Sequence, residues 1–76
     1  MEQLMTMLKE IRPDVAFEDA AALMDDGLLD SFDIVAIVGE ISSAYGITVP
    51  VEEIRNENFN SAKAMLEMIE RIKAEG

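Results

Sequence analysis

The stretch Gly27-Leu28-Leu29-Asp30-Ser31-Phe32-Asp33 stands at the start of the longest apolar helical segment of the chain. A turn centred on Asp26-Gly27 leads into it, and Asp30 is a residue type that caps helix N-termini. Ser31 then lies in the first helical turn, where its hydroxyl faces outward beside free backbone N–H groups. Because the positive end of the helix dipole favours an anion, the position suits a serine that carries a phosphodiester.

The residues that follow have the periodicity of a helix from about Ser31 to Tyr45, and Gly46 supplies a left-handed stop. The core-facing side chains recur three and four residues apart: Ile34, Ile37, Val38, Ile41 and Tyr45. The outer face carries small and acidic residues, namely Asp33, Ala36, Gly39, Glu40 and Ser43. Either the small side chains of this face let a partner approach the helix backbone closely, or Gly39 has no function there. In the second case Gly39 only lowers the stability of the helix, by up to about 1 kcal/mol relative to alanine.

Two further main helices are predicted near the ends of the chain. The first runs from about Glu2 to Ile11 and ends at Arg12-Pro13, because residues before proline avoid the helical region. The last starts near Ser61, capped by Asn60 or Ser61, and runs to about Lys73. Their apolar stripes are Leu4, Leu8 and Ile11 in the first, and Ala62, Met65, Leu66, Ile69 and Ile72 in the last.

The connections between these helices are also patterned. The loop from about 14 to 29 is expected to pack apolar side chains onto the core, with a turn of helix at 20–22. Those side chains are Val15, Phe17, Leu23, Met24, Leu28 and Leu29. Residues 48–54 are expected to form a short extended segment followed by one brief helix. Residues 56–60 are expected to end that helix. The sequence therefore predicts an all-α protein, a small four-helix bundle with three main helices and one short one, in a single domain over residues 1–76.

Composition removes most enzyme chemistry. The chain has 76 residues, half of them apolar, with no cysteine and no histidine. A thiolate nucleophile and a disulfide scaffold are excluded, and Ser31 has no imidazole to activate it for hydrolysis or transfer. No apolar run approaches the roughly 20 residues of a membrane span, and the first residues begin no cationic secretory signal. We therefore expect a soluble cytoplasmic monomer with no transmembrane segment.

Charge is distributed unevenly along the chain, whose net charge is −10. Residues 13–54 contain ten acids and neither lysine nor arginine, so all six basic residues lie toward the two ends. We expect an unopposed negative potential around Ser31, which would attract basic partner surfaces and repel nucleic acid. The same acids would also keep a small protein soluble, and the pattern alone does not separate the two roles.

The residues described so far resemble an acyl carrier protein, over essentially residues 1–76. The likeness rests on the triplet Asp30-Ser31-Phe32, preceded by a glycine-containing turn and followed by an amphipathic helix. Residues 46–50 resemble the family's link into its short third helix, and residues 59–62 resemble the start of its last helix. The resemblance implies that Ser31 bears a 4′-phosphopantetheine arm whose thiol holds a thioester, and that the protein has no catalysis of its own.

The resemblance also implies partners. These are a phosphopantetheinyl transferase that uses CoA and Mg²⁺, an adenylating ligase or synthase, and an acyltransferase, all meeting the carrier through basic surfaces. Asp30 either caps the helix or orients the metal or a basic side chain of the transferase, and both roles can hold together. The expected partner surface comprises Asp33, Ala36, Ile37, Glu40, Phe32 and Ile54. Phe32, Ile54 and Phe59 either contact the arm or its load or are core residues, and the core is the more common place for such side chains.

The departures from the family pattern bear on the load. Ala36 and Ser43 stand where fatty-acid carriers often have glutamates, and this weakens a fatty-acid assignment. Residues 28–32 look closer to the D-alanyl carrier proteins of Gram-positive cell-wall modification, which favours an aminoacyl load. Stand-alone peptidyl and polyketide carriers share these traits, so a fatty-acid or polyketide carrier remains the alternative.

Two rival classes of protein fit less well. A calcium-binding loop is suggested by residues 24–27, but aligning Gly27 with its glycine puts Ala22 and Met24 at ligand positions, where neither can bind calcium. An unmodified acidic interaction module explains the charge and leaves an exposed Ser31 without a role. Phosphorylation of Ser31 is a third and smaller alternative.

Overall fold

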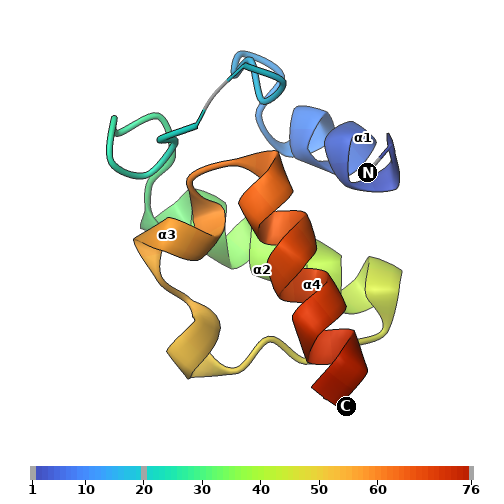
Figure 1. The fold of residues 1–76 in the computed structure, drawn as a ribbon. Coiled ribbons are helices and arrows are strands. Elements are labelled where there is room, and N and C mark those ends of the chain that lie inside the picture. The colour runs from blue at the N-terminus through green and yellow to red at the C-terminus, as the bar shows by residue number, and fades with distance from the viewer. Residues whose placement is uncertain (1, 20, 76) are drawn as a thin grey trace.

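A computed structural model describes residues 2–19 and 21–75 of the chain (Figure 1). Its helices are α1 (Glu2–Ile11), α2 (Ser31–Tyr45), α3 (Asn56–Phe59) and α4 (Ala62–Glu75), with a 3₁₀ turn at Val51–Glu53. The described residues form no strand. The predicted all-α bundle of three main helices and one short helix is therefore confirmed.

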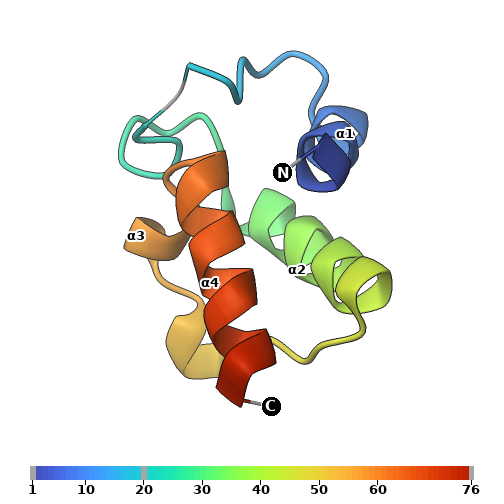
Figure 2. The same ribbon diagram turned by 45° about the vertical axis from the view of Figure 1, so that its right-hand side comes forward.

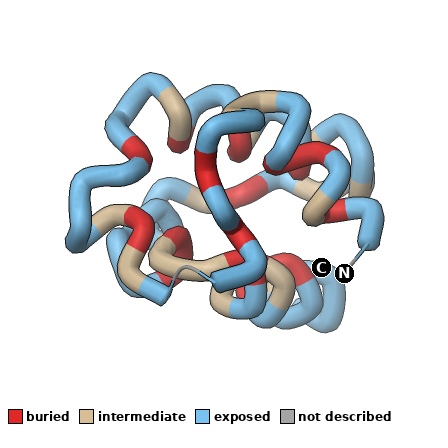
Figure 3. Tube along the Cα trace, turned by 90° about the horizontal axis from the view of Figure 1, so that it is seen from above, coloured by how far each residue is buried: buried red, intermediate tan, exposed pale blue. Residues whose placement is uncertain are grey.

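The three long helices enclose one apolar core. α1 packs against both α2 and α4, and the short α3 lies against α4. Figure 1 shows α4 passing in front of α2 with α1 above them, and Figure 2 shows α2 beside α4. Buried positions recur along each helix, with exposed positions between them (Figure 3). The largest fully buried side chains are Leu4, Leu8, Phe17, Leu23, Ile37, Ile41, Phe59, Met65, Met68 and Ile69.

Both ends of α2 are fixed by local chemistry. Asp30 has an extended backbone and accepts a hydrogen bond from the N–H of Asp33 (3.0 Å), while Asp33 Oδ2 accepts from the N–H of Asp30 (3.1 Å). This reciprocal capping box satisfies two backbone donors at the helix start. At the other end Gly46 adopts φ 64°, the left-handed conformation that glycine tolerates best. The predicted bounds of α2 are confirmed.

The start of α4 settles which residue caps it. Ser61 Oγ accepts from the N–H of Ala64 at 3.0 Å, so Ser61 is the cap and the side chain of Asn60 is used elsewhere. The helix continues to Glu75, two residues beyond the predicted end. Helix ends fray, and a difference of this size is ordinary.

The expectation that residues 56–60 break the helical structure is wrong. Asn56–Phe59 forms α3, because Phe59 is buried in the core and Asn58 donates from Nδ2 to the backbone oxygen of Glu53 at 2.6 Å. Tertiary burial here overrides the weak helix propensity of asparagine. The brief helix expected just before it is the 3₁₀ turn.

The long loop packs largely as expected. Val15, Phe17, Leu23 and Leu29 are buried and Met24 is half-buried, whereas Leu28 is 46% exposed, so its predicted burial is wrong. A turn of helix is predicted at 20–22. Ala20 lies outside the described residues, and Ala21 and Ala22 are not helical, so the prediction is wrong for these two residues. No helix in the described ranges combines the length and the apolarity that crossing a membrane requires.

Two leucines of the loop give a matched test of this packing. Leu23 is 0% exposed and Leu28 is 46% exposed. Leu23→Ala should lower the free energy of unfolding by about 2–5 kcal/mol, because it leaves a cavity in the core. Leu28→Ala should lower it by about 0.5 kcal/mol or less. Urea melts of both variants measure the difference, and equal losses would contradict the described loop.

Candidate functional site

Ser31 occupies the first helical position of α2, directly after the N-cap. It is exposed, as is Asp30 before it. The backbone N–H groups of Ser31 and Phe32 belong to the first turn, whose donors have no partner within the helix. An anion attached to the Ser31 oxygen would therefore meet unpaired donors and the positive end of the α2 dipole.

Asp33 serves the structure more than the surface. Besides accepting from the Asp30 N–H, its Oδ2 accepts from Nη1 of Arg12, and its side chain is only 13% exposed. Arg12 also donates to both carboxylate oxygens of Asp14, which holds the pKa of Asp14 below its ordinary value. The prediction that Asp33 faces outward for partners is therefore corrected, and the negative potential near Ser31 is locally opposed by Arg12.

An apolar groove of about 360 Å³ opens directly beside Ser31. Three segments of the chain build it: the long loop supplies Met24, and the residue after the 3₁₀ turn supplies Ile54. α2 contributes Ser31, Ile34, Val35 and Val38. An extended and partly apolar chain bonded to the Ser31 oxygen would have this groove within reach.

Large apolar side chains also lie open to solvent near Ser31, either next to it on α2 or across the groove. Phe32 is 85% exposed, Val35 71% and Ile54 39%, whereas Phe59 is buried at 1%. The core interpretation is thus confirmed for Phe59 and wrong for Phe32, and Ile54 is half open at the groove. Sequence reasoning missed Val35, although its place four residues after Ser31 puts it on the same helix face.

The remaining residues of the predicted partner surface differ in their exposure. Ile37 is 0% exposed, so its inclusion in that surface is wrong and it belongs to the core. Ala36 and Glu40 are exposed as expected. Glu40, however, lines a separate shallow groove between α1 and α2 together with Glu10. It lies about 13 Å along the helix axis from Ser31, nine residues at about 1.5 Å each.

The charges that remain free around Ser31 are acidic. Asp25, Asp26, Asp30 and Glu52 are exposed. Most of the basic side chains are held in ion pairs, namely Lys9 with Glu18, Arg12 with Asp14 and Asp33, Arg55 with Glu57, and Arg71 with Glu53. Within the described residues no group of three or more acidic side chains is arranged to hold a metal ion.

Ile54 is held in place from α3 and α4. Its neighbour Glu53 accepts from Arg71 and from Nδ2 of Asn58, and the hydrogen bond from Arg71 is the main reason that the pKa of Glu53 lies below its ordinary value. Asn58 also binds the Glu53 backbone oxygen. This side of the groove is therefore anchored by a charged network.

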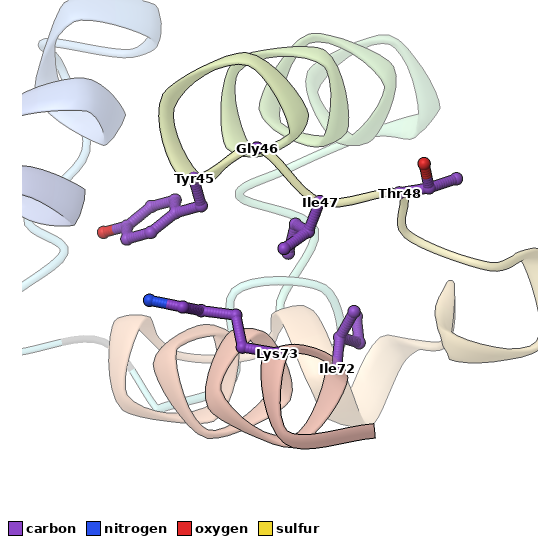
Figure 4. A pocket seen from close by; sticks show the side chains of 6 residues that line it. All are labelled: Tyr45, Gly46, Ile47, Thr48, Ile72 and Lys73. Atoms are coloured by element: carbon purple, nitrogen blue, oxygen red, sulfur yellow. The ribbon is translucent and has the colours of Figure 1, made fainter. Parts of the chain in front are cut away.

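A larger hollow of about 470 Å³ lies at the opposite end of α2 (Figure 4). In the figure Tyr45 and Lys73 reach toward each other from α2 and α4, and Lys73 Nζ lies 5.9 Å from the centre of the Tyr45 ring. α2 has no basic residue in its own last turn. Lys73 of α4 instead places a positive charge near the negative end of the α2 dipole. The hollow contains neither Ser31 nor a group that could activate it.

Comparison with known proteins points to one family. The sequence profile described as "Phosphopantetheine attachment site" matches residues 2–69. A D-alanyl carrier protein of Streptococcus equi subsp. zooepidemicus is 34% identical over 61 residues, which cover 74% of this chain and 77% of the relative. Those of Streptococcus suis and Streptococcus mutans are 31% and 30% identical over 70 and 69 residues, covering 86% and 84% of this chain and 84% and 87% of the relatives. No solved structure matches significantly.

The capping role of Asp30 can be tested by substitution. Asp30→Ala removes the cap of α2 and should lower the free energy of unfolding by about 1 kcal/mol. Asp30→Asn keeps an oxygen that accepts from the Asp33 N–H, so its stability should stay within a few tenths of a kcal/mol of the parent, as expected of a good cap. Thermal melts of the two variants decide this, and equal destabilisation would show that charge, not capping, is what Asp30 contributes.

Proposed function

Because the chain belongs to the carrier-protein family that bears a 4′-phosphopantetheine arm, we propose that Ser31 is the residue to which the arm is attached. The single observation that carries the proposal is the exposed Ser31 at the first position of α2, with an apolar groove beside it. The protein is a carrier and not an enzyme, in keeping with its lack of histidine and cysteine.

The residues around Ser31 fit such an arm. The first-turn N–H groups would bind the phosphate that links the arm to Ser31, and the side chains of Met24, Val35 and Ile54 offer an apolar surface next to it. When bound, the arm supplies the thiol that this cysteine-free chain lacks, and on it a load is held as a thioester. The capping box keeps the start of α2 fixed, so that Ser31 is presented in one orientation.

We propose D-alanine or another small amino acid as the load. The curated relatives described above are D-alanyl carrier proteins. A long acyl chain in the interior would lie among Leu4, Ile37, Ile54, Met65 and Ile69, but only Ile54 of these lines the groove beside Ser31, and the other four are at most 1% exposed. A small polar load has no reason to enter this apolar core. A fatty-acid or polyketide load is the second candidate, favoured only by the apolar groove.

The proposed partners are a phosphopantetheinyl transferase, an adenylating ligase or synthase, and an acyltransferase. Free acids at Asp25, Asp26 and Asp30 support a basic surface on each partner, and the exposed Phe32 and Val35 support an apolar contact at its centre. If the acids act on encounter, the initial rate of modification should fall as salt rises. A rate independent of salt would leave these acids a role in solubility only.

The attachment site is tested by intact-protein mass spectrometry. Incubation of the protein with CoA, Mg²⁺ and a broad-specificity phosphopantetheinyl transferase should add the mass of one arm. Ser31→Ala should abolish the gain, because the nucleophilic oxygen is removed, while its melting temperature stays close to that of the parent.

The matched control is Ser43→Ala, which removes an exposed hydroxyl on the same helix and should leave the modification intact. An arm that maps to Ser42, Ser43 or Ser61, or an unchanged mass with several transferases, would refute the assignment of Ser31.

The load is tested on the modified protein. With ATP and a D-alanine-adenylating ligase, the arm should become aminoacylated, and the melting temperature should change little because a small load buries little apolar area. A long fatty acyl group, if it can be loaded at all, should also fail to stabilise the fold. Thermal melts of both forms provide the measurement, and marked stabilisation by the long chain would favour the fatty-acid alternative.

A further inference from the structure

Asn60, in the junction between α3 and α4, is joined to the long loop by four hydrogen bonds. Its side-chain Oδ1 accepts hydrogen bonds from the backbone N–H groups of Met24 (2.9 Å) and Asp25 (3.1 Å). Its Nδ2 donates to Oδ2 of Asp25 at 3.2 Å, and its backbone oxygen accepts from the N–H of Leu23 at 2.8 Å. One residue therefore binds three consecutive residues of the long loop, which are 35 to 37 positions away in the sequence.

The segment that Asn60 holds leads directly to Ser31. The Leu23 backbone oxygen accepts from the N–H groups of Leu28 and Leu29, which closes the turn just before the capping box of α2. Met24, whose N–H is bound by Asn60, forms the loop side of the groove next to Ser31. Asp25, the third residue bound, is one of the exposed acids.

The side chain of Asn60 has no other role in the fold that would explain these hydrogen bonds. Ser61 caps α4, so the amide of Asn60 is not needed for the helix start. Asn60 is also absent from the lining of the groove. Its side chain acts on the surroundings of Ser31 only through the loop that it binds.

We propose that Asn60 is a positioning residue, which fixes residues 23–25 and thereby holds the groove and the acidic turn beside Ser31 in the arrangement that the transferase recognises. The kinetic part of this inference rests on the proposed function of Ser31. Ser31 itself is oriented by the Asp30–Asp33 capping box, which Asn60 does not touch. Loosening the loop should therefore weaken recognition and leave the chemical step unchanged.

Three variants isolate the role of the Asn60 amide. Asn60→Ala removes both its acceptor and its donor. Asn60→Asp keeps the acceptor for Met24 and Asp25 but places a second carboxylate against that of Asp25, where like charges repel. Combining Asn60→Asp with Asp25→Asn exchanges the two groups, because the new amide at 25 can donate to the new carboxylate at 60. This exchanged pair should restore the contact.

The direct measurement is amide hydrogen exchange at Met24 and Asp25, whose N–H groups Asn60 binds. Since one ordinary hydrogen bond shifts a conformational equilibrium about fivefold, exchange at both amides should accelerate at least about fivefold in Asn60→Ala. It should accelerate in Asn60→Asp as well and return toward the parent rate in the exchanged pair. Exchange that is unchanged in Asn60→Ala would overturn the proposal.

The functional measurement is the steady-state kinetics of arm transfer with each apo variant as substrate. The KM for Asn60→Ala and for Asn60→Asp should rise by about three- to tenfold, with kcat within about twofold of the parent, because only the competent fraction of the carrier falls. The exchanged pair moves the carboxylate from position 25 to position 60 and should lower the KM below that of Asn60→Asp. A fall in kcat with KM unchanged in Asn60→Ala, or a KM of the exchanged pair at or above that of Asn60→Asp, would overturn the positioning role.

The control for general loss of stability is Ile72→Ala, a half-buried position of α4 at the far end from Ser31. It should lower the melting temperature without raising KM or the exchange of Met24 and Asp25. A raised KM in this variant would mean that stability alone explains the effect. If the parent protein accepts no arm, the proposed function fails, while the exchange data still decide whether Asn60 holds the loop.

Discussion

A chain of 76 residues without disulfides has to recruit its longest loop into the hydrophobic core. Three helices of 10, 15 and 14 residues bury too little apolar surface by themselves, and Phe17, Leu23 and Leu29 of the loop complete the core. The loop therefore cannot move freely, although it is irregular. Its burial fixes where the chain approaches α2, and the local capping box then orients Ser31.

The acidic residues divide by what they touch. Asp33, Glu53 and Asp14 each accept from an arginine and hold segments together, with Arg12 and Arg71 as the cationic ends of these networks. Asp25, Asp26 and Asp30 stay exposed close to Ser31. A single net charge of −10 thus conceals two populations, one of acids paired with arginines and one of exposed acids that form no ion pair within the described residues.

A carrier needs a surface more than a catalytic centre. The side chains beside Ser31 are apolar and open to solvent, at a cost in hydration that a purely structural helix start would avoid. In the proposed function, an acidic border around such a surface would steer basic partners toward it, and the apolar part would stabilise the complex once the surfaces are in contact. The same residues would give an arm on Ser31 an apolar wall when no partner is bound.

What the sequence determined by itself is everything governed by neighbours within about four positions: the bounds of α1 and α2, the Asp30 cap, the Gly46 stop and the place of Ser31 in the first turn. Periodicity also identified most of the core. The core interpretation of Phe32, the expected burial of Leu28 and the place of Ile37 in the partner surface were wrong, and Val35 was missed, because exposure depends on which segments cover a helix face. Periodicity gave no sign of α3, whose stability comes from burying Phe59.

Only the tertiary structure decided what surrounds Ser31. The groove joins Met24, α2 and Ile54, and the bonds from Asn60 to the loop span 35 to 37 positions, as the Arg12–Asp33 pair spans 21. No local pattern encodes such pairings, because a hydrogen bond or an apolar contact between distant segments depends on how whole elements pack. The sequence therefore located the serine, and the packing of a loop, a 3₁₀ turn and two helices built the site around it.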